Sequence, residues 1–122
     1  MGGRGMYSAT GGFTRREYET VGMLEDLKVI EPIDKSKKKA NLPLYSGTPG
    51  TSYIKLDGEG HFQQLRVYGE DRLPVLDIDY GRHKPLTGDE KGYRAHDWQN
   101  GKRQPGRFMT DKELQRYQKY FV

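Results

Sequence analysis

Residues 53–80 read YIKLDGEGHFQQLRVYGEDRLPVLDIDY, and the fold of the chain is decided here. Apolar and polar residues alternate along Tyr53–Leu56 and along the runs that end at Tyr68 and Tyr80. A period of two is the pattern of a strand that buries one face. Short turns rich in glycine and acidic residues separate the three runs. The stretch therefore predicts three consecutive strands of an antiparallel meander.

The middle strand of this meander, His61–Tyr68, has a break in its alternation. Leu65 and Val67 share one face, but Phe62 falls on the other. A β-bulge adds one residue to a strand and so changes the face of the residues beyond it. We therefore expect a bulge near Gln63–Gln64 that returns Phe62 to the apolar face.

Outward from this stretch, the sequence predicts one further strand. Pro74 stands near the start of the third strand, Leu73–Tyr80, a position that proline tolerates. A loop over residues 81–91 leads to a fourth strand, Tyr93–Trp98. The Asn100–Gly101 dipeptide after it is typical of a tight turn.

A helix is predicted on each side of these four strands. Thr14 and Glu17 have the spacing of a capping box, and apolar residues then recur at helical spacing up to residue 28. Thr110 and Glu113 repeat the capping box and predict a C-terminal helix of about ten residues. The predicted fold class is α+β: an antiparallel four-stranded meander with an N-terminal and a C-terminal helix packed on it.

The length of 122 residues suits one domain. Residues 1–12 hold five glycines and are expected to form a flexible N-terminal lead-in. Residues 13–122 are expected to form a single α+β domain, with a long basic loop at 31–52 that contains three prolines. Only 33% of the residues are hydrophobic, so the core must be small.

Composition narrows the classes of function. The chain has no cysteine, which excludes disulfides and thiolate metal sites. No apolar run reaches the roughly 20 residues of a membrane span, and no signal-peptide core follows the N-terminus. We therefore expect an intracellular protein that does not bind membranes. The net charge of +4 favours anionic partners through local patches, although it is also an ordinary charge for a solubilised surface.

Basic, aromatic and histidine residues gather between Asp77 and Arg107. Arginine and lysine neutralise phosphates, while aromatic rings stack on bases. The same mixture also serves protein–protein contacts. The residues predicted to bind phosphate or nucleic acid are Arg82, Lys84, Arg94, Trp98, Lys102, Arg103 and Arg107.

Catalysis is an alternative use of this segment. Metal-independent cleavage of RNA needs a general base, a general acid and cations that stabilise the developing charge. His83 and His96 are the candidate catalytic residues, although both also suit ordinary structural roles. Asp77 and Asp79 with these histidines could bind a metal, but no compact ligand motif is present. We expect no metal and no cofactor, and we interpret the two aspartates as the solvated face of a strand.

The segments Asp77–His83, Ala95–Trp98 and Asn100–Arg103, followed by a capped helix, resemble small domains encoded by bacteriophages and mobile elements. Similar segments end some phage minor head proteins and polymorphic toxins. The resemblance covers residues 52–120 and implies a ribonuclease-like toxin domain that uses His83 and His96, located in the host cytoplasm or on the virion. Tyr93–His96 carries one histidine where the related segments have more, a departure that puts catalysis in doubt and leaves binding intact.

Two hypotheses follow. The leading one is a phage- or mobile-element-type basic domain that binds nucleic acid or nucleotide phosphates, with RNA, a nucleotide or another anionic ligand as its partner. The alternative is a non-enzymatic phage-encoded inhibitor of host immunity (an anti-CRISPR or other anti-defence protein) or a structural protein, acting through contact with a host protein. The start at Met1 and the small size fit a free-standing inhibitor. The sequence does not predict an oligomeric state.

Overall fold

The computed structural model describes residues 17–37, 41–82 and 90–122, and within them a seven-stranded mixed sheet dominates. Strands β2 and β3 are parallel, and every other neighbouring pair is antiparallel. In order across the sheet the strands are β1 (Tyr18–Leu24), β2 (Leu27–Pro32), β3 (Ser52–Leu56), β4 (Phe62–Tyr68), β5 (Pro74–Arg82), β6 (Lys91–Gln99) and β7 (Lys102–Arg103). The remaining elements are helix α2 (Asp111–Tyr117) and the 3-10 turns η1 (Lys35–Lys37) and η2 (Gln118–Tyr120).

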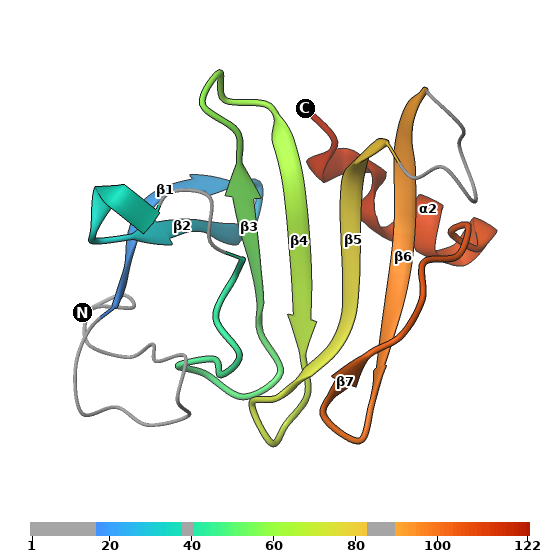
Figure 1. Cartoon of the computed structure of the whole chain (residues 1–122), viewed down its shortest axis with the longest axis horizontal. Helices are drawn as coiled ribbons and strands as arrows, with labels where there is room; N and C mark the ends of the chain where they lie inside the picture. The colour runs from blue at the N-terminus through green and yellow to red at the C-terminus, as the bar shows by residue number, and fades with distance from the viewer. Residues whose placement is uncertain (1–16, 38–40, 83–89) are drawn as a thin grey trace.

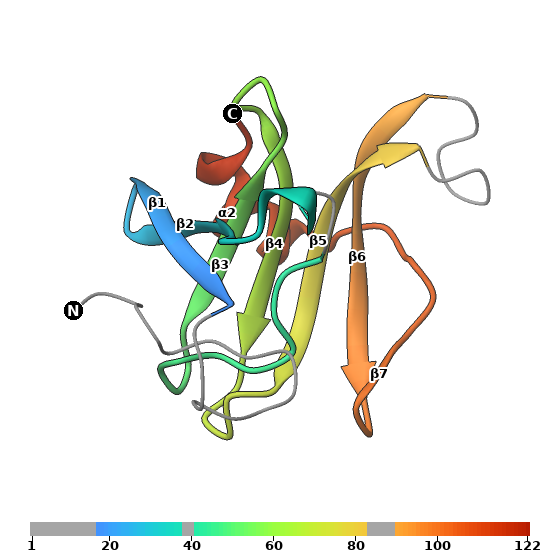
Figure 2. The ribbon, with the colours of Figure 1, turned by 60° about the vertical axis from the view of Figure 1, so that its left-hand side comes forward.

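The predicted N-terminal helix over residues 14–28 is wrong, because the described part of it is a β-hairpin. Strands β1 and β2 join through a two-residue turn in which Glu25 has a φ of 55°. Val21, a member of the supposed helical stripe, is 49% exposed. The β-branched pair Val29–Ile30 is buried instead, as suits a strand inside a sheet. The hairpin runs across the direction of β3–β6 (Figure 1, Figure 2).

The four predicted strands correspond to β3–β6, but the predicted fold class is wrong because the sheet continues on both sides of them. The expected bulge is confirmed: Leu56 pairs with Phe62 and Lys55 with Gln64, so Gln63 is the extra residue. The predicted turn at Asn100–Gly101 is also confirmed, with positive φ at both residues.

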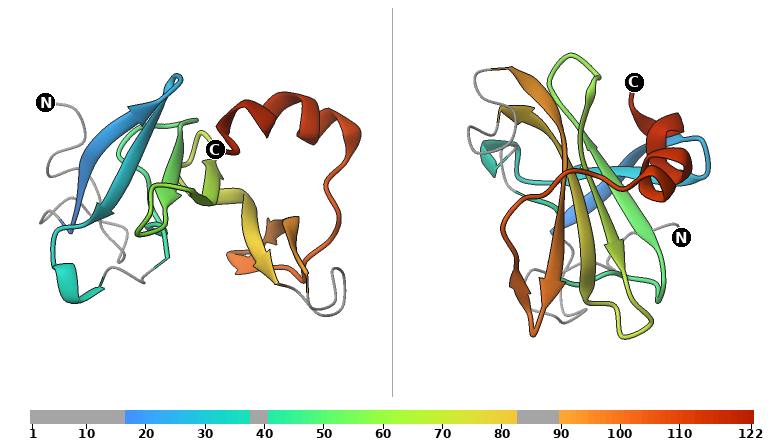
Figure 3. Two further views of the ribbon diagram at one scale, coloured as in Figure 1. Left: turned by 90° about the horizontal axis from the view of Figure 1, so that it is seen from above. Right: turned by 90° about the vertical axis from the view of Figure 1, so that its right-hand side faces the viewer.

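The apolar face of the sheet packs against the C-terminal segment. The predicted C-terminal helix is confirmed as α2 followed by η2, with Thr110 and Glu113 forming the capping box. Helix α2 lies on one side of the sheet (Figure 3). The buried side chains of this core are Val29, Ile54, Phe62, Leu65, Ile78, Tyr117 and Tyr120.

A second, smaller core lies on the opposite face. Tyr18 and Ile30 of the hairpin pack there with Tyr53 and Tyr68, and Leu42 covers them from the segment before β3. The expected long loop at 31–52 thus contains buried residues in its described part. Within the described ranges, no helix is long and apolar enough to cross a membrane.

The capping box gives a test of the fold. Thr110 Oγ1 accepts a hydrogen bond from the backbone N–H of Glu113 at 3.1 Å. We expect Thr110→Ala to lower the free energy of unfolding by about 1 kcal/mol, because an N–H at the helix start loses its partner. Urea denaturation followed by circular dichroism measures this, with exposed Thr48→Ala as the control. Equal stabilities of the two variants would contradict the role of the cap.

Candidate functional site

The face of β3–β7 opposite α2 carries two rows of polar side chains, and we call it the polar face. Residues that pair directly across neighbouring strands point to the same side of a sheet. The first row runs Lys55–Gln64–Asp79–Arg94, one residue from each of β3 to β6. The second row runs Tyr53–Arg66–Asp77–His96 on the same four strands. Arg103 pairs with Trp98 and adds β7 to this face.

A buried ion pair forms the centre of the second row. The Arg66 guanidinium donates two hydrogen bonds to the Asp77 carboxylate, at 2.7 and 2.9 Å. Both side chains are almost completely buried, at 2% and 0% exposed. Burial lowers the pKa of Arg66, but the hydrogen bonds to Asp77 and the nearby charges of Asp77, Tyr68 and Asp79 together raise it above its ordinary value, so the arginine stays charged. Arg103 Nε lies 3.1 Å from the same carboxylate.

These contacts correct the interpretation of the two aspartates as a solvated strand face. Asp77 is buried, and Asp79 binds Arg103 through an ion pair and Gln64 Nε2 at 3.2 Å. The alternation of acids misled the prediction because the middle of β5, at Asp77 and Ile78, is buried on both faces. The metal hypothesis used these carboxylates, which are instead held by arginines. Among the described residues, no group of three or more potential ligands is placed to hold a metal.

His96 lies at the end of the second row and is 7% exposed. Its Nδ1 lies 2.9 Å from the carbonyl oxygen of Gln104. A carbonyl only accepts, so Nδ1 carries the proton and donates. The other ring nitrogen, Nε2, lies 3.7 Å from Asp79 Oδ2. Burial lowers the pKa of His96, so the imidazole is neutral at pH 7.

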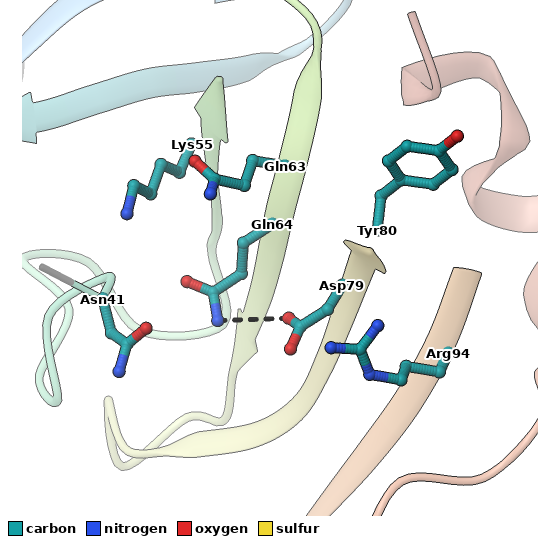
Figure 4. A pocket seen from close by; sticks show the side chains of 7 residues that line it. All are labelled: Asn41, Lys55, Gln63, Gln64, Asp79, Tyr80 and Arg94. Atoms are coloured by element: carbon teal, nitrogen blue, oxygen red, sulfur yellow. Dashed lines mark hydrogen bonds between the residues drawn. The ribbon is translucent and has the colours of Figure 1, made fainter. Parts of the chain in front are cut away.

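The first row forms the floor of a pocket of about 140 Å³ (Figure 4). Gln64 and Asp79 lie at its centre, with Lys55 on one side and Arg94 on the other. Lys55 is only 8% exposed, and burial lowers its pKa while the charge of Asp79 opposes that shift. The lining residues are Asn41, Lys55, Gln63, Gln64, Asp79, Tyr80 and Arg94.

Arg94 is a side chain of the pocket whose hydrogen bonding is incomplete. Its Nε and Nη1 atoms are buried, and neither has a hydrogen-bond partner in the described part of the chain. Burying such a donor without a partner costs free energy, and a charged donor costs more than a neutral one. Its guanidinium points toward Asp79 in the pocket (Figure 4). The pocket therefore contains a cation with unused donors.

The structure brings only some of the predicted site residues together. Arg94, His96, Trp98 and Arg103 share the polar face. Trp98 is half-buried, with the guanidinium of Arg66 5.0 Å from its ring centroid. Arg82 and Lys102 are exposed and pair at positions of the other face. His83 and Lys84 lie outside the described residues.

Arg107 lies on the helix side of the sheet and acts as a clamp. It forms two hydrogen bonds with Asp97 of β6 and two with Glu113 of α2. These four bonds hold the helix to the sheet, and Nη1 also donates to the carbonyl oxygen of Phe108 at 3.1 Å. Arg107 is therefore engaged in contacts inside the protein.

Sequence reasoning missed four residues of the pocket: Asn41, Lys55, Gln63 and Gln64. Lys55 and Gln64 occupy polar positions of strands in which polar and apolar residues alternate, and such positions are usually solvated. One signal in the sequence could have found them. Gln64, Arg66 and Tyr68 occupy successive positions of one face of β4, and no small turn residue stands between these large side chains. Asn41 gave no signal, because only the fold brings its loop to the sheet.

Comparisons of the chain with protein-family models, curated proteins and solved structures found no match.

The Arg107 clamp makes stability depend on pH. The pKa values of Asp97 and Glu113 are lowered from 3.8 and 4.5, in each case chiefly by hydrogen bonds from Arg107. A carboxylate with a lowered folded pKa stabilises the protein above its unfolded pKa, and this contribution is lost as the pH falls through the folded value. We expect Arg107→Gln to flatten the fall in the urea midpoint between pH 5 and pH 3. A variant with the unchanged pH profile would contradict the clamp.

The buried pair gives a second stability test. We expect Asp77→Asn to lower the free energy of unfolding by about 3–5 kcal/mol, because it leaves the buried Arg66 without its counter-charge. Urea denaturation measures the loss, and Asp111→Asn on the exposed start of α2 is the matched control. A loss no larger than that of the control would show that the pair does not hold the polar face.

Proposed function

We propose that this chain binds the phosphate groups of nucleic acid or nucleotides in the pocket on its polar face. The observation that carries the proposal is Arg94, whose Nε and Nη1 are buried at the pocket without partners among the described residues. Guanidinium groups match phosphate oxygens in shape and charge, and they bind them with two parallel hydrogen bonds. A bound phosphate would accept a hydrogen bond from a donor that the protein leaves unused.

The charge balance of the polar face supports the same ligand. The described strand residues of this face include four cations, and two carboxylates stand against them. His96 is neutral and adds no charge at pH 7. Excess positive charge on a partly buried surface attracts anions more strongly than the same charge in water, because the local dielectric constant is lower. The cations are Lys55, Arg66, Arg94 and Arg103.

The proposal is binding without catalysis. His96 is not among the residues that line the pocket, and its Nδ1 is committed to the carbonyl of Gln104. A general base must reach the proton that it removes, directly or through one water. The neighbours of His96 instead hold it as part of the sheet. Cleavage by His83 and His96 therefore stays a prediction of the sequence, tested by incubating varied RNA with the protein with and without divalent metal.

Binding is measured by the fluorescence anisotropy of a labelled single-stranded ten-nucleotide RNA at low salt. We expect Arg94→Gln to weaken binding roughly ten- to a hundredfold, the loss of a hydrogen bond to a charged group. We also expect it to make the slope of log K against log salt shallower by about 0.7, the value for one phosphate contact on a single strand.

Arg116→Gln is the matched control, because it removes the same charge from the exposed outer side of α2. The proposal fails if the wild-type protein leaves the anisotropy of labelled RNA, DNA and nucleotides unchanged at low salt. It also fails if both variants weaken binding equally, since the attraction would then come from the net charge alone. Either result would favour the alternative, a phage-encoded inhibitor or structural protein that acts through protein contact.

A further inference from the structure

The order of charges along the first row is cation, amide, carboxylate, cation. Lys55 and Arg94 stand at its ends, and Asp79 lies between them in the same pocket. Adjacent strands are about 4.8 Å apart, so the backbones of the two cations are separated by roughly 14 Å. The side chains of Lys55 and Arg94 both line the pocket between these strands. A row with this order suits a ligand that carries negative charge on both sides of a neutral group.

Asp79 decides what that neutral group must be. Its carboxylate accepts from Gln64 Nε2 and Arg103, and its side chain is 14% exposed at the pocket. An ionised carboxylate offers about four acceptor positions and no donor, so acceptor positions remain for a ligand. It repels a phosphate placed directly above it. It attracts a hydroxyl that can donate.

A ribonucleotide chain has this arrangement, because each ribose lies between two phosphates and carries a 2′-hydroxyl. We infer that the pocket distinguishes RNA from DNA, with the 2′-hydroxyl of one ribose donating to Asp79 and the flanking phosphates bound by Lys55 and Arg94. This inference rests on the proposed phosphate binding. The 2′-hydroxyl is the group by which proteins tell the two nucleic acids apart at a given site.

The surroundings of Asp79 prepare it for this role. Arg103 fixes one oxygen of the carboxylate through an ion pair, while Gln64 fixes the other through a hydrogen bond. Gln64 is itself held, because its Oε1 accepts from the backbone N–H of Leu42 at 3.3 Å. A preorganised acceptor loses little conformational freedom when a ligand binds. Gln63 and Asn41 line the pocket and present amides to the rest of the nucleotide.

The test compares four labelled single strands of one ten-nucleotide sequence: RNA, DNA, 2′-fluoro RNA and 2′-O-methyl RNA. The last three lack the hydroxyl donor, and the phosphates are the same in all four. We expect the wild-type protein to bind RNA at least about tenfold more tightly than each of the others. Because only the ligand is changed, this result does not depend on the folding of any variant.

Asp79→Asn is the matching protein variant, with circular dichroism to confirm its fold. We expect it to reduce the preference for RNA over 2′-fluoro RNA at least threefold, since a neutral amide is the weaker acceptor. Equal binding of all four strands, with Arg94→Gln weakening each, would overturn the inference and leave the proposed function standing. A preference for RNA that Asp79→Asn leaves unchanged would also overturn it. No binding of any strand would overturn both.

Discussion

The buried ion pair between Arg66 and Asp77 is the contact on which the polar face depends. Removing two charges from water is expensive, and it is tolerated only where each charge is fully bonded. Arg66 therefore also donates to the backbone carbonyls of Leu42 and Pro43, which ties the segment before β3 onto the sheet. Tyr68 donates to the same Pro43 carbonyl. One arginine thus joins two strands and a loop, and the pocket lies beside this junction.

The two faces of the sheet have different roles: one packs the larger apolar core, and the other carries the charged side chains. The face under α2 carries the larger apolar core, and the Arg107 clamp holds the helix in place there. Because that face supplies apolar burial, the other can carry charged rows that would be a poor core on their own. Arg103 neutralises part of the charge of Asp77 and Asp79. The net charge that remains on the polar face is positive, and it is concentrated at the pocket where the proposed ligand binds.

Local signals in the sequence were reliable where the residues concerned set their own conformation. Thr110 and Glu113 bond to each other's backbone, so the helix start follows from four consecutive residues. Asn100–Gly101 reaches positive φ with little strain, which makes the turn predictable. The bulge at Gln63 followed from the phase of the apolar residues around it. The prediction of an N-terminal helix failed because Tyr18, Val21 and Leu24 fit a helical spacing by chance. The pairing of β1 with β2 decided the structure of this segment instead.

The sequence by itself determined the strands β3–β6, the capped C-terminal helix and the concentration of basic residues after Asp77. The sequence also identified Arg94 as a candidate for binding phosphate, because arginine beside aromatic residues is suited to that role in any fold. Only the tertiary structure decided that Arg94 shares a pocket with Lys55 and Asp79. The reason is that side chains from separate strands meet through the register of backbone hydrogen bonds, and that register depends on the whole sheet.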